Sequence, residues 1–142
     1  MTHDPILYGV CAVIAEVLEL DEQDLSADTY VFRDLDTESI DLLEYGIGMG
    51  RHFGIRMQDS TAFLKDLRVH LAHADAVQNG STATQAQRIA HLRTVYPHLA
   101  EERLAAMLDD LAASTNARPV LRISDIADYV RHTLNAQKPA AA

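Results

Sequence analysis

The chain has 142 residues, of which 48% are hydrophobic, and it contains one cysteine and no tryptophan. This length suits a single domain with a real core, and one cysteine excludes internal disulfides and cysteine-rich metal sites. The sequence has no uninterrupted apolar run of about 18 residues and no secretory leader, so we expect no membrane span and a cytoplasmic protein. The composition favours an all-helical fold.

Acidic residues are concentrated in the first part of the chain. Residues 1–50 contain twelve acidic and one basic side chain, a net charge of −11, whereas the whole chain has a net charge of −9. A surface of this kind repels nucleic acid, which requires Lys and Arg to neutralise its phosphates, and it attracts basic protein surfaces. The charge therefore predicts protein partners with basic patches, with simple solubility as the other interpretation.

The first helix is predicted by apolar residues spaced three and four apart between Pro5 and Leu20. Cys11 lies within it, and we expect this side chain to be a small buried hydrophobic group. The next segment, Asp21 to Arg33, is acidic and has no periodicity. It predicts a long structured loop anchored by Leu25, Val31 and Phe32.

A second helix should begin near Glu38 or Ser39 and end at about Phe53. Two apolar stripes run along it, roughly 150° apart. One stripe is enough to face a core, so the second predicts a contact face for another molecule; burial of both sides is the alternative. The first stripe is Leu42, Tyr45, Met49 and Phe53, and the second is Ile40, Leu43 and Ile47, bordered by Asp41 and Glu44.

Three glycines, Gly46, Gly48 and Gly50, lie inside this second helix, where each costs about 1 kcal/mol relative to Ala. Their spacing is not that of a nucleotide-binding loop, and no strand precedes them. They predict close helix packing or local softness.

The rest of the chain predicts four helices, three of them between about Gln58 and Val120. The first carries Phe63, Leu67, Leu71 and Ala74 and ends before Asn79. The second is capped by Ser81 or Thr82 and ends at Pro97, and the third contains Leu104 to Leu111. After a break at Asn116 to Pro119, Ser124 is expected to cap the last helix, with Ile126, Tyr129, Val130 and Leu134 facing inward.

The sequence contains few signals of a catalytic or metal site. His70 and His73 lie three residues apart and could form half of a metal site, but no third ligand is evident. A hydrolase would require a Gly-x-Ser-x-Gly elbow or a nucleophile with an evident base, and neither is present. We therefore expect the protein not to be an enzyme.

The stretch Thr29 to Glu44 resembles the signature of acyl carrier proteins. In that family a loop ends in a hydrophobic residue, two polar residues and Leu, followed by an acidic residue, Ser, a hydrophobic residue, an acidic residue and a later Glu. The matching residues here are Phe32, Arg33, Asp34, Leu35, Glu38, Ser39, Ile40, Asp41 and Glu44. The flanking helices and Ile123 to Val130 resemble the family as well, so the resemblance covers about residues 5–57 and 121–134.

This resemblance implies that Ser39 carries a covalent 4′-phosphopantetheine arm that holds acyl groups as thioesters. The partners it implies are a phosphopantetheinyl transferase and the acyl-loading and acyl-processing enzymes of a fatty acid, polyketide or specialised lipid pathway. Basic patches on these partners would dock on six residues, namely Glu38, Ile40, Asp41, Leu43, Glu44 and Ile47.

The chain departs from the family pattern in two places. Asp36 stands where family members usually have Gly, which we expect to alter the loop backbone and add negative charge. The other departure is a helical insertion at residues 58–120, where the family has a short loop and one small helix. We expect one carrier domain over residues 1–142, with core 5–57 and 121–134, an insertion packed on that core as a lid, larger cavity or docking surface, and a loose tail at 136–142.

Two other functions remain open at this point. A peptidyl or aminoacyl carrier protein would share the arm but carry a different cargo. A helical adaptor without a prosthetic group would use the acidic helix only to hold a partner.

Overall fold

The computed structural model describes residues 4–76, 83–113 and 119–137, and its regular elements are helices throughout these ranges. An isolated antiparallel bridge joins Tyr30 to Arg122, but no strand occurs among the described residues. None of the helices described is both long and apolar enough to cross a membrane. The predicted all-α bundle with additional helices is confirmed.

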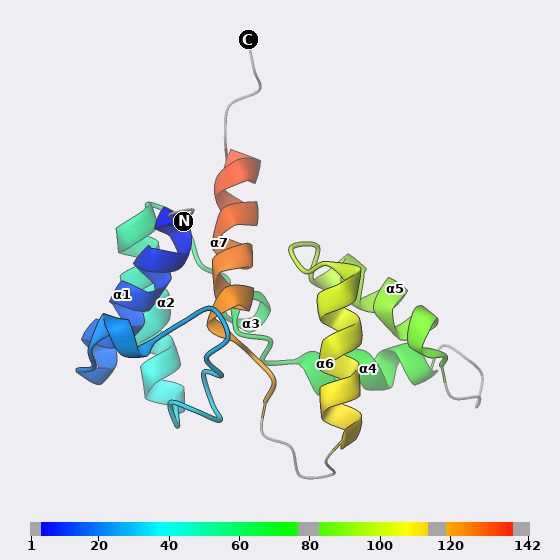
Figure 1. Ribbon diagram of the computed structural model, residues 1–142. Coiled ribbons are helices and arrows are strands. Elements are labelled where there is room, and N and C mark those ends of the chain that lie inside the picture. The colour runs from blue at the N-terminus through cyan, green and yellow to red at the C-terminus, as the bar shows by residue number, and fades with distance from the viewer. Residues whose placement is uncertain (1–3, 77–82, 114–118, 138–142) are drawn as a thin grey trace.

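The helices form two groups (Figure 1). Contacts join α1, α2, α3 and α7 in the first group, and α4, α5 and α6 in the second. The first group is α1 (Pro5–Leu18), α2 (Ser39–Phe53), the short α3 (Asp59–Ala62) and α7 (Ile123–Gln137), with the 3-10 helix η1 (Glu22–Asp24) in the loop after α1. The second group is α4 (Leu67–Ala76), α5 (Gln85–Val95) and α6 (Glu101–Ala113). Residues 58–120, called the middle segment below, thus contain α3 to α6.

Helix α1 has defined signals at both ends. The Asp4 carboxylate accepts hydrogen bonds from the backbone N–H groups of Ile6 and Leu7, at 3.1 and 3.2 Å, which satisfies two of the helix's unpaired donors. The helix ends at Leu18 because Glu19 takes a left-handed conformation, with φ 57°. It is therefore two residues shorter than predicted.

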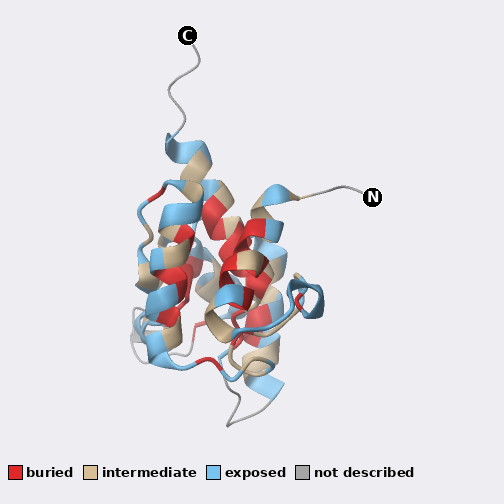
Figure 2. Cartoon of the chain, turned by 90° about the vertical axis from the view of Figure 1, so that its left-hand side faces the viewer, coloured by how far each residue is buried: buried red, intermediate tan, exposed pale blue. Residues whose placement is uncertain are grey.

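Glycines allow α1 and α2 to approach closely. A Cβ at Gly48 would lie 2.8 Å from Cγ1 of Val13, and a Cβ at Gly9 would lie 2.7 Å from His52 and Phe53 side-chain atoms. Close packing, one of the two explanations predicted for the glycines, therefore applies at Gly48. The core of this group (Figure 2) includes the buried side chains of Val10, Ile14, Tyr45, Met49, Ile126 and Val130.

The middle segment begins differently from the prediction. One helix was expected to carry Phe63 and Leu67, but the chain forms α3, turns, and starts again as α4. The turn occurs because Leu64 adopts φ 55° while the Lys65 N–H binds the carbonyl of Ser60 at 3.1 Å. This is the hydrogen bond of a Schellman helix end. Its left-handed residue is usually Gly, so a leucine there gives no sequence signal.

Later helix boundaries also differ in detail. Thr84 caps α5 through reciprocal bonds with Gln87, whereas the predicted starts, Ser81 and Thr82, lie outside the described residues. Helix α5 ends at Val95, just before Pro97 as predicted. Helix α7 begins at Ile123, so Ser124 is its second residue and not its cap, and it continues to Gln137. Of the expected loose tail, residues 136 and 137 are helical and 138–142 are not described.

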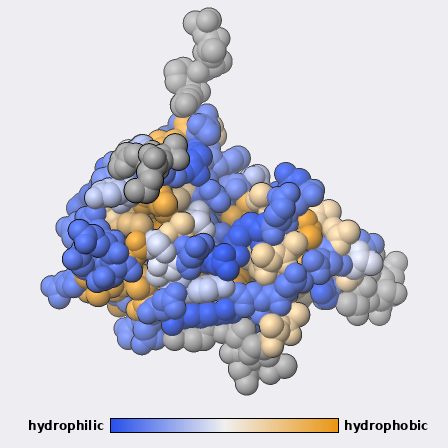
Figure 3. Space-filling view, viewed as in Figure 1, coloured by the Kyte–Doolittle hydropathy of each residue, from blue (hydrophilic) through white to orange (hydrophobic). Residues whose placement is uncertain are grey.

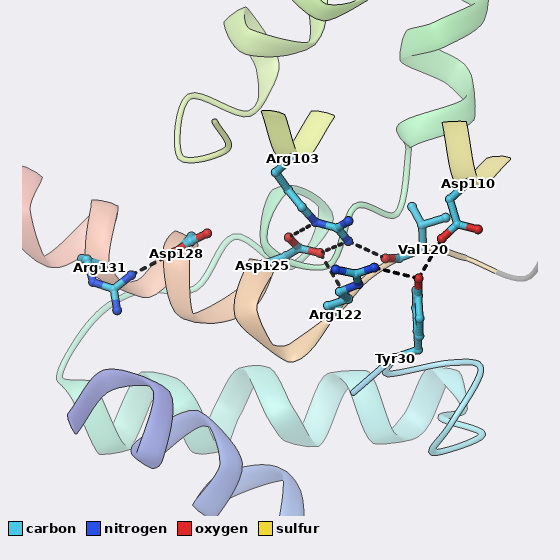
Figure 4. Close-up of polar contacts among 8 residues, drawn as sticks. All are labelled: Tyr30, Arg103, Asp110, Val120, Arg122, Asp125, Asp128 and Arg131. Carbon is cyan, nitrogen blue, oxygen red and sulfur yellow. Dashed lines mark hydrogen bonds and ion pairs between the residues drawn. The ribbon is translucent and has the colours of Figure 1, made fainter. Parts of the chain in front are cut away.

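A polar network joins the two groups (Figure 4). Arg103 of α6 forms a two-pronged ion pair with Asp125 of α7, at 2.7 and 2.9 Å, and also donates to the carbonyl of Val120 at 2.9 Å. Asp110, which lies in α6 like Arg103, accepts a hydrogen bond from the Tyr30 hydroxyl at 2.8 Å. The middle segment is therefore tied to both α7 and the loop that precedes α2.

Candidate functional site

Ser39 is the first residue of α2 and is exposed. Glu38, with an extended backbone, occupies the N-cap position, and its N–H donates to the Asp41 carboxylate at 2.8 Å. Ser39 is therefore not the N-cap of α2. As the first helical residue, Ser39 lies in the first turn, where backbone N–H groups lack partners within the helix and the helix dipole is positive.

Thr37 holds the loop that leads to Ser39. Its hydroxyl donates to the carbonyl of Val31 at 2.7 Å and lies 3.0 Å from the hydroxyl of Tyr45 in α2. Burial raises the pKa of Tyr45 above its usual value. The N–H of Val31 in turn binds the carbonyl of Leu121, so the loop is fixed to α2 on one side and to the start of α7 on the other.

Asp36, where the family usually has glycine, adopts φ 52°. This left-handed region favours Gly, and Asp tolerates it better than most other residues. The loop therefore has, at Asp36, a backbone conformation that a glycine would take without strain.

The second apolar stripe of α2 faces solvent. Ile40, Leu43 and Ile47 are 57%, 51% and 50% exposed, whereas Leu42, Tyr45 and Met49 of the first stripe are buried. The alternative in which α2 is buried on both sides is therefore wrong. Glu38 and Glu44 are exposed beside this stripe and Asp41 is partly exposed, so its border is acidic.

A pocket of about 280 Å³ lies next to Ser39. Its walls come from two parts of the chain, and it is lined by Phe32, Ser39, Leu42, Phe63, Leu64, Lys65 and Pro119. The last four belong to the middle segment and are distant from Ser39 in sequence. Sequence reasoning missed them, because no local pattern indicates that residues 24 to 80 positions away share a pocket with a serine.

Arg33 and Asp110 form a second link between the loop and α6. The guanidinium of Arg33 donates two bonds to the Asp110 carboxylate, at 2.8 and 3.0 Å, and these hydrogen bonds hold the pKa of Asp110 below its usual value. Both Arg33 and Arg122 also lie over the Tyr30 ring, 4.8 and 4.9 Å from its centre. Arg33 was expected only as a member of the signature, and its partner Asp110 was not predicted.

The remaining candidates lie outside this site. Cys11 is buried and burial raises its pKa, so the thiol is the small hydrophobic group expected from the sequence. The His73 ring stacks on His91, with ring centres 5.5 Å apart. Within the described ranges, no three His, Cys, Asp or Glu side chains are grouped to hold a metal ion.

Viewed as in Figure 3, the surface is mostly hydrophilic with smaller hydrophobic areas.

Comparison with known proteins adds one match. Residues 9–67 match the family model described as a phosphopantetheine attachment site, a range that includes Ser39 and the whole of α2. No curated protein and no solved structure matches the chain significantly.

Proposed function

We propose that the chain is a phosphopantetheine-binding carrier that holds acyl groups on an arm attached to Ser39; the match of residues 9–67 to the model of a phosphopantetheine attachment site supports this. Domains of this family hold a covalent 4′-phosphopantetheine and are carriers, not catalysts. The observation that carries the proposal is the position of Ser39, exposed at the first turn of α2 within the matched range.

The start of α2 suits a phosphodiester. A phosphate on the Ser39 oxygen would face backbone N–H groups of the first turn, and the helix dipole favours negative charge there. The exposed Lys65 lines the same pocket and adds a positive charge. The arm supplies the thiol needed for thioesters, which the buried Cys11 is poorly placed to provide.

The solvent-facing stripe of α2 supports docking of partner enzymes. Ile40, Leu43 and Ile47 would form the apolar centre of the contact, while Glu38, Asp41 and Glu44 would attract basic patches. We expect a phosphopantetheinyl transferase and acyl-processing enzymes to use this face in turn.

Acyl cargo is favoured over peptidyl cargo by two features. The first fifty residues are strongly acidic, and the pocket at Ser39 is lined mainly by apolar side chains, including Phe32, Leu42 and Phe63. A peptide would bury amide groups against these walls with few partners, at a cost in free energy. An aminoacyl or peptidyl carrier is the second candidate.

The first prediction concerns Ser39. The wild-type protein, incubated with coenzyme A and a broad-specificity phosphopantetheinyl transferase, should gain the mass of one arm, and Ser39→Ala should gain none. The substitution removes only a hydroxyl at an exposed position, so we expect a loss of stability of about 1 kcal/mol or less. Intact-mass spectrometry and circular dichroism measure the two effects.

Ser60→Ala is the matched control, because Ser60 is also exposed and near the start of a helix, α3. It should gain the arm normally. Arm transfer to Ser39→Ala would refute the attachment site, and no transfer to the wild-type protein would favour an adaptor. Identification of the thioester-bound group on protein from its own source separates acyl from peptidyl cargo.

A further inference from the structure

A second hollow lies between α4, α6 and the segment that leads into α7. It has a volume of about 170 Å³. Its walls are mainly aliphatic, with two basic side chains, and it is lined by Leu64, Lys65, Leu67, Arg68, Val69, Leu111, Pro119, Val120 and Leu121. All but Leu121 belong to the middle segment.

This second hollow adjoins the pocket at Ser39. Leu64, Lys65 and Pro119 line both. The two hollows therefore share a wall, and a ligand that enters beside Ser39 needs only to pass these three side chains to reach the second one. Together they reach the size of small-molecule sites, which begin at roughly 300 Å³.

Leu64 is held at this shared wall by an unusual backbone conformation. It adopts φ 55°, a left-handed conformation that favours glycine, and its side chain is 8% exposed. Non-glycine residues in this region are held there by their surroundings and are enriched at functional sites. The Schellman bond between Lys65 and Ser60 fixes the turn, so Leu64 presents an apolar side chain to both hollows.

The chemistry of the lining changes along the path. Its start has the Ser39 hydroxyl and the Lys65 ammonium, which suit an anionic group. Farther from Ser39, most of the wall is aliphatic, including Leu67, Leu111 and Val120, which suit an apolar chain, and the two basic side chains of the lining, Lys65 and Arg68, are exposed. Val69, a large apolar side chain that also lines this second hollow, is 65% exposed.

We propose that the middle segment supplies a second chamber, which receives the distal end of an apolar acyl chain tethered to Ser39. The inference rests on the proposed carrier function and narrows its cargo to chains long enough to pass Leu64. An acetyl group would offer only one methyl group to the apolar walls of the chamber. A peptidyl group would place amide groups against aliphatic walls, where they would lack hydrogen-bond partners.

The test compares loaded forms of the full-length protein. A broad-specificity transferase with acetyl-coenzyme A or dodecanoyl-coenzyme A gives two proteins that differ only in acyl length, and intact mass confirms each. We expect the dodecanoyl form to melt higher than the acetyl form, by on the order of 3 °C. Its amide exchange should slow at residues 64–69 and 119–121 and stay unchanged in α1.

A variant with a larger side chain inside the chamber tests the proposal, and it has a matched control on the same helix. Leu111→Trp places a larger side chain on a residue that lines the chamber, whereas Ala112→Trp adds the same side chain at the next, exposed position of α6. Both unloaded variants are first checked by circular dichroism and melting temperature. Leu111→Trp should accept the arm but lose the gain from dodecanoyl loading, and Ala112→Trp should keep it.

A second measurement uses acyl ligands that are not covalently attached to Ser39. Ser39→Ala protein, titrated with free S-dodecanoyl-pantetheine, should show NMR shifts at Leu64, Val69 and Val120, and free S-acetyl-pantetheine should not. Equal melting temperatures for the two loaded forms, or protection confined to α1 and α2, would overturn the chamber while leaving the carrier function intact. Failure of the wild-type protein to accept any arm would refute the carrier function and this inference with it.

Discussion

At the scale of single residues, His98 is a strongly perturbed titratable group. It lies between α5 and α6, and its ring packs edge-on against Tyr96 and against Tyr129 of α7, with ring centres 6.1 and 5.4 Å away. Its Nε2 is buried without a hydrogen-bond partner among the described residues. Burial, with a smaller contribution from His132, lowers the pKa of His98 to about 4 from its usual 6.5.

This shift predicts that stability depends on pH. Between pH 6.5 and about 4 the unfolded chain binds a proton at His98 and the folded protein does not, so the free energy of unfolding falls as pH falls through this window. At 1.36 kcal/mol per unit, the loss is at most about 3 kcal/mol. Urea unfolding at pH 7 and pH 4.5 measures it.

His98→Phe should flatten this dependence, since the ring remains and the titration is removed. His132→Phe is the control, because His132 is exposed on α7, and it should retain most of the slope. An unchanged slope in the His98 variant would show that other groups cause the pH dependence.

At the scale of elements, the packing of α1 against α2 depends on Gly48. A Cβ there would lie 2.8 Å from Val13, which is buried and has a branched, stiff side chain. A Cβ at Gly46 would instead meet the carboxylate of Asp59, 2.6 Å away at the end of a flexible side chain that is only partly buried. The same substitution should therefore have different results at two positions of one helix.

We predict that Gly48→Ala lowers the free energy of unfolding by about 1 kcal/mol, because overpacking costs about 1–3 kcal/mol and the better helix propensity of Ala returns about 1 kcal/mol. Gly46→Ala should be neutral or stabilising. Urea denaturation of both variants measures the difference, and a Gly48 variant as stable as the Gly46 variant would contradict the close contact with Val13.

The exposed face of α2 gives a prediction about partner association. Glu44→Lys should slow association with a phosphopantetheinyl transferase roughly threefold to tenfold at low salt, and the effect should shrink as salt rises. Asp41 is left intact, since its carboxylate binds the Glu38 N–H and its loss would also disturb the start of α2. Stopped-flow kinetics at several salt concentrations measure the rates.

Glu102→Lys is the charge-matched control, since Glu102 is exposed in the first turn of α6. It should have a smaller effect on association than Glu44→Lys. Equal effects from the two reversals would indicate general attraction by net charge and would argue against docking on α2.

At the scale of the whole molecule, the polar network between α6 and α7 joins the two groups of helices. The side chain of Asp125 is 1% exposed, and it accepts bonds from Arg103 and from the N–H of Arg122. Loss of the Arg103 guanidinium would leave a buried carboxylate with only part of its partners. An exposed ion pair provides the contrast to this buried one. It joins Arg93 to Glu101 at 3.1 Å, and the two side chains are 50% and 65% exposed.

We predict that Arg103→Met destabilises the protein by about 3 kcal/mol or more, and that Arg93→Met costs less than about 1 kcal/mol. Urea unfolding followed by circular dichroism measures both. If Arg103→Met matched Arg93→Met, the buried ion pair would not hold the groups together. A single transition in the wild-type protein would support the proposal that residues 1–142 form one carrier domain.

The sequence alone determined the elements whose signals are local. Apolar periodicity predicted the ends of α1 and α2 to within two residues, and the ordered signature placed Ser39 at the start of α2. The two stripes predicted the exposed face of Ile40, Leu43 and Ile47. These predictions succeeded because helix period, caps and loop motifs are properties of neighbouring residues.

Other features depend on contacts between distant parts of the chain and arise only from tertiary packing. Leu64 breaks a helix without a glycine, Asp110 binds a loop 77 residues earlier, and Pro119 shares a pocket with Ser39. A left-handed leucine is held by its surroundings, and ion pairs and pockets form between residues that packing brings together. No local pattern encodes these pairings, because their free energy exists only once the two groups of helices are in contact.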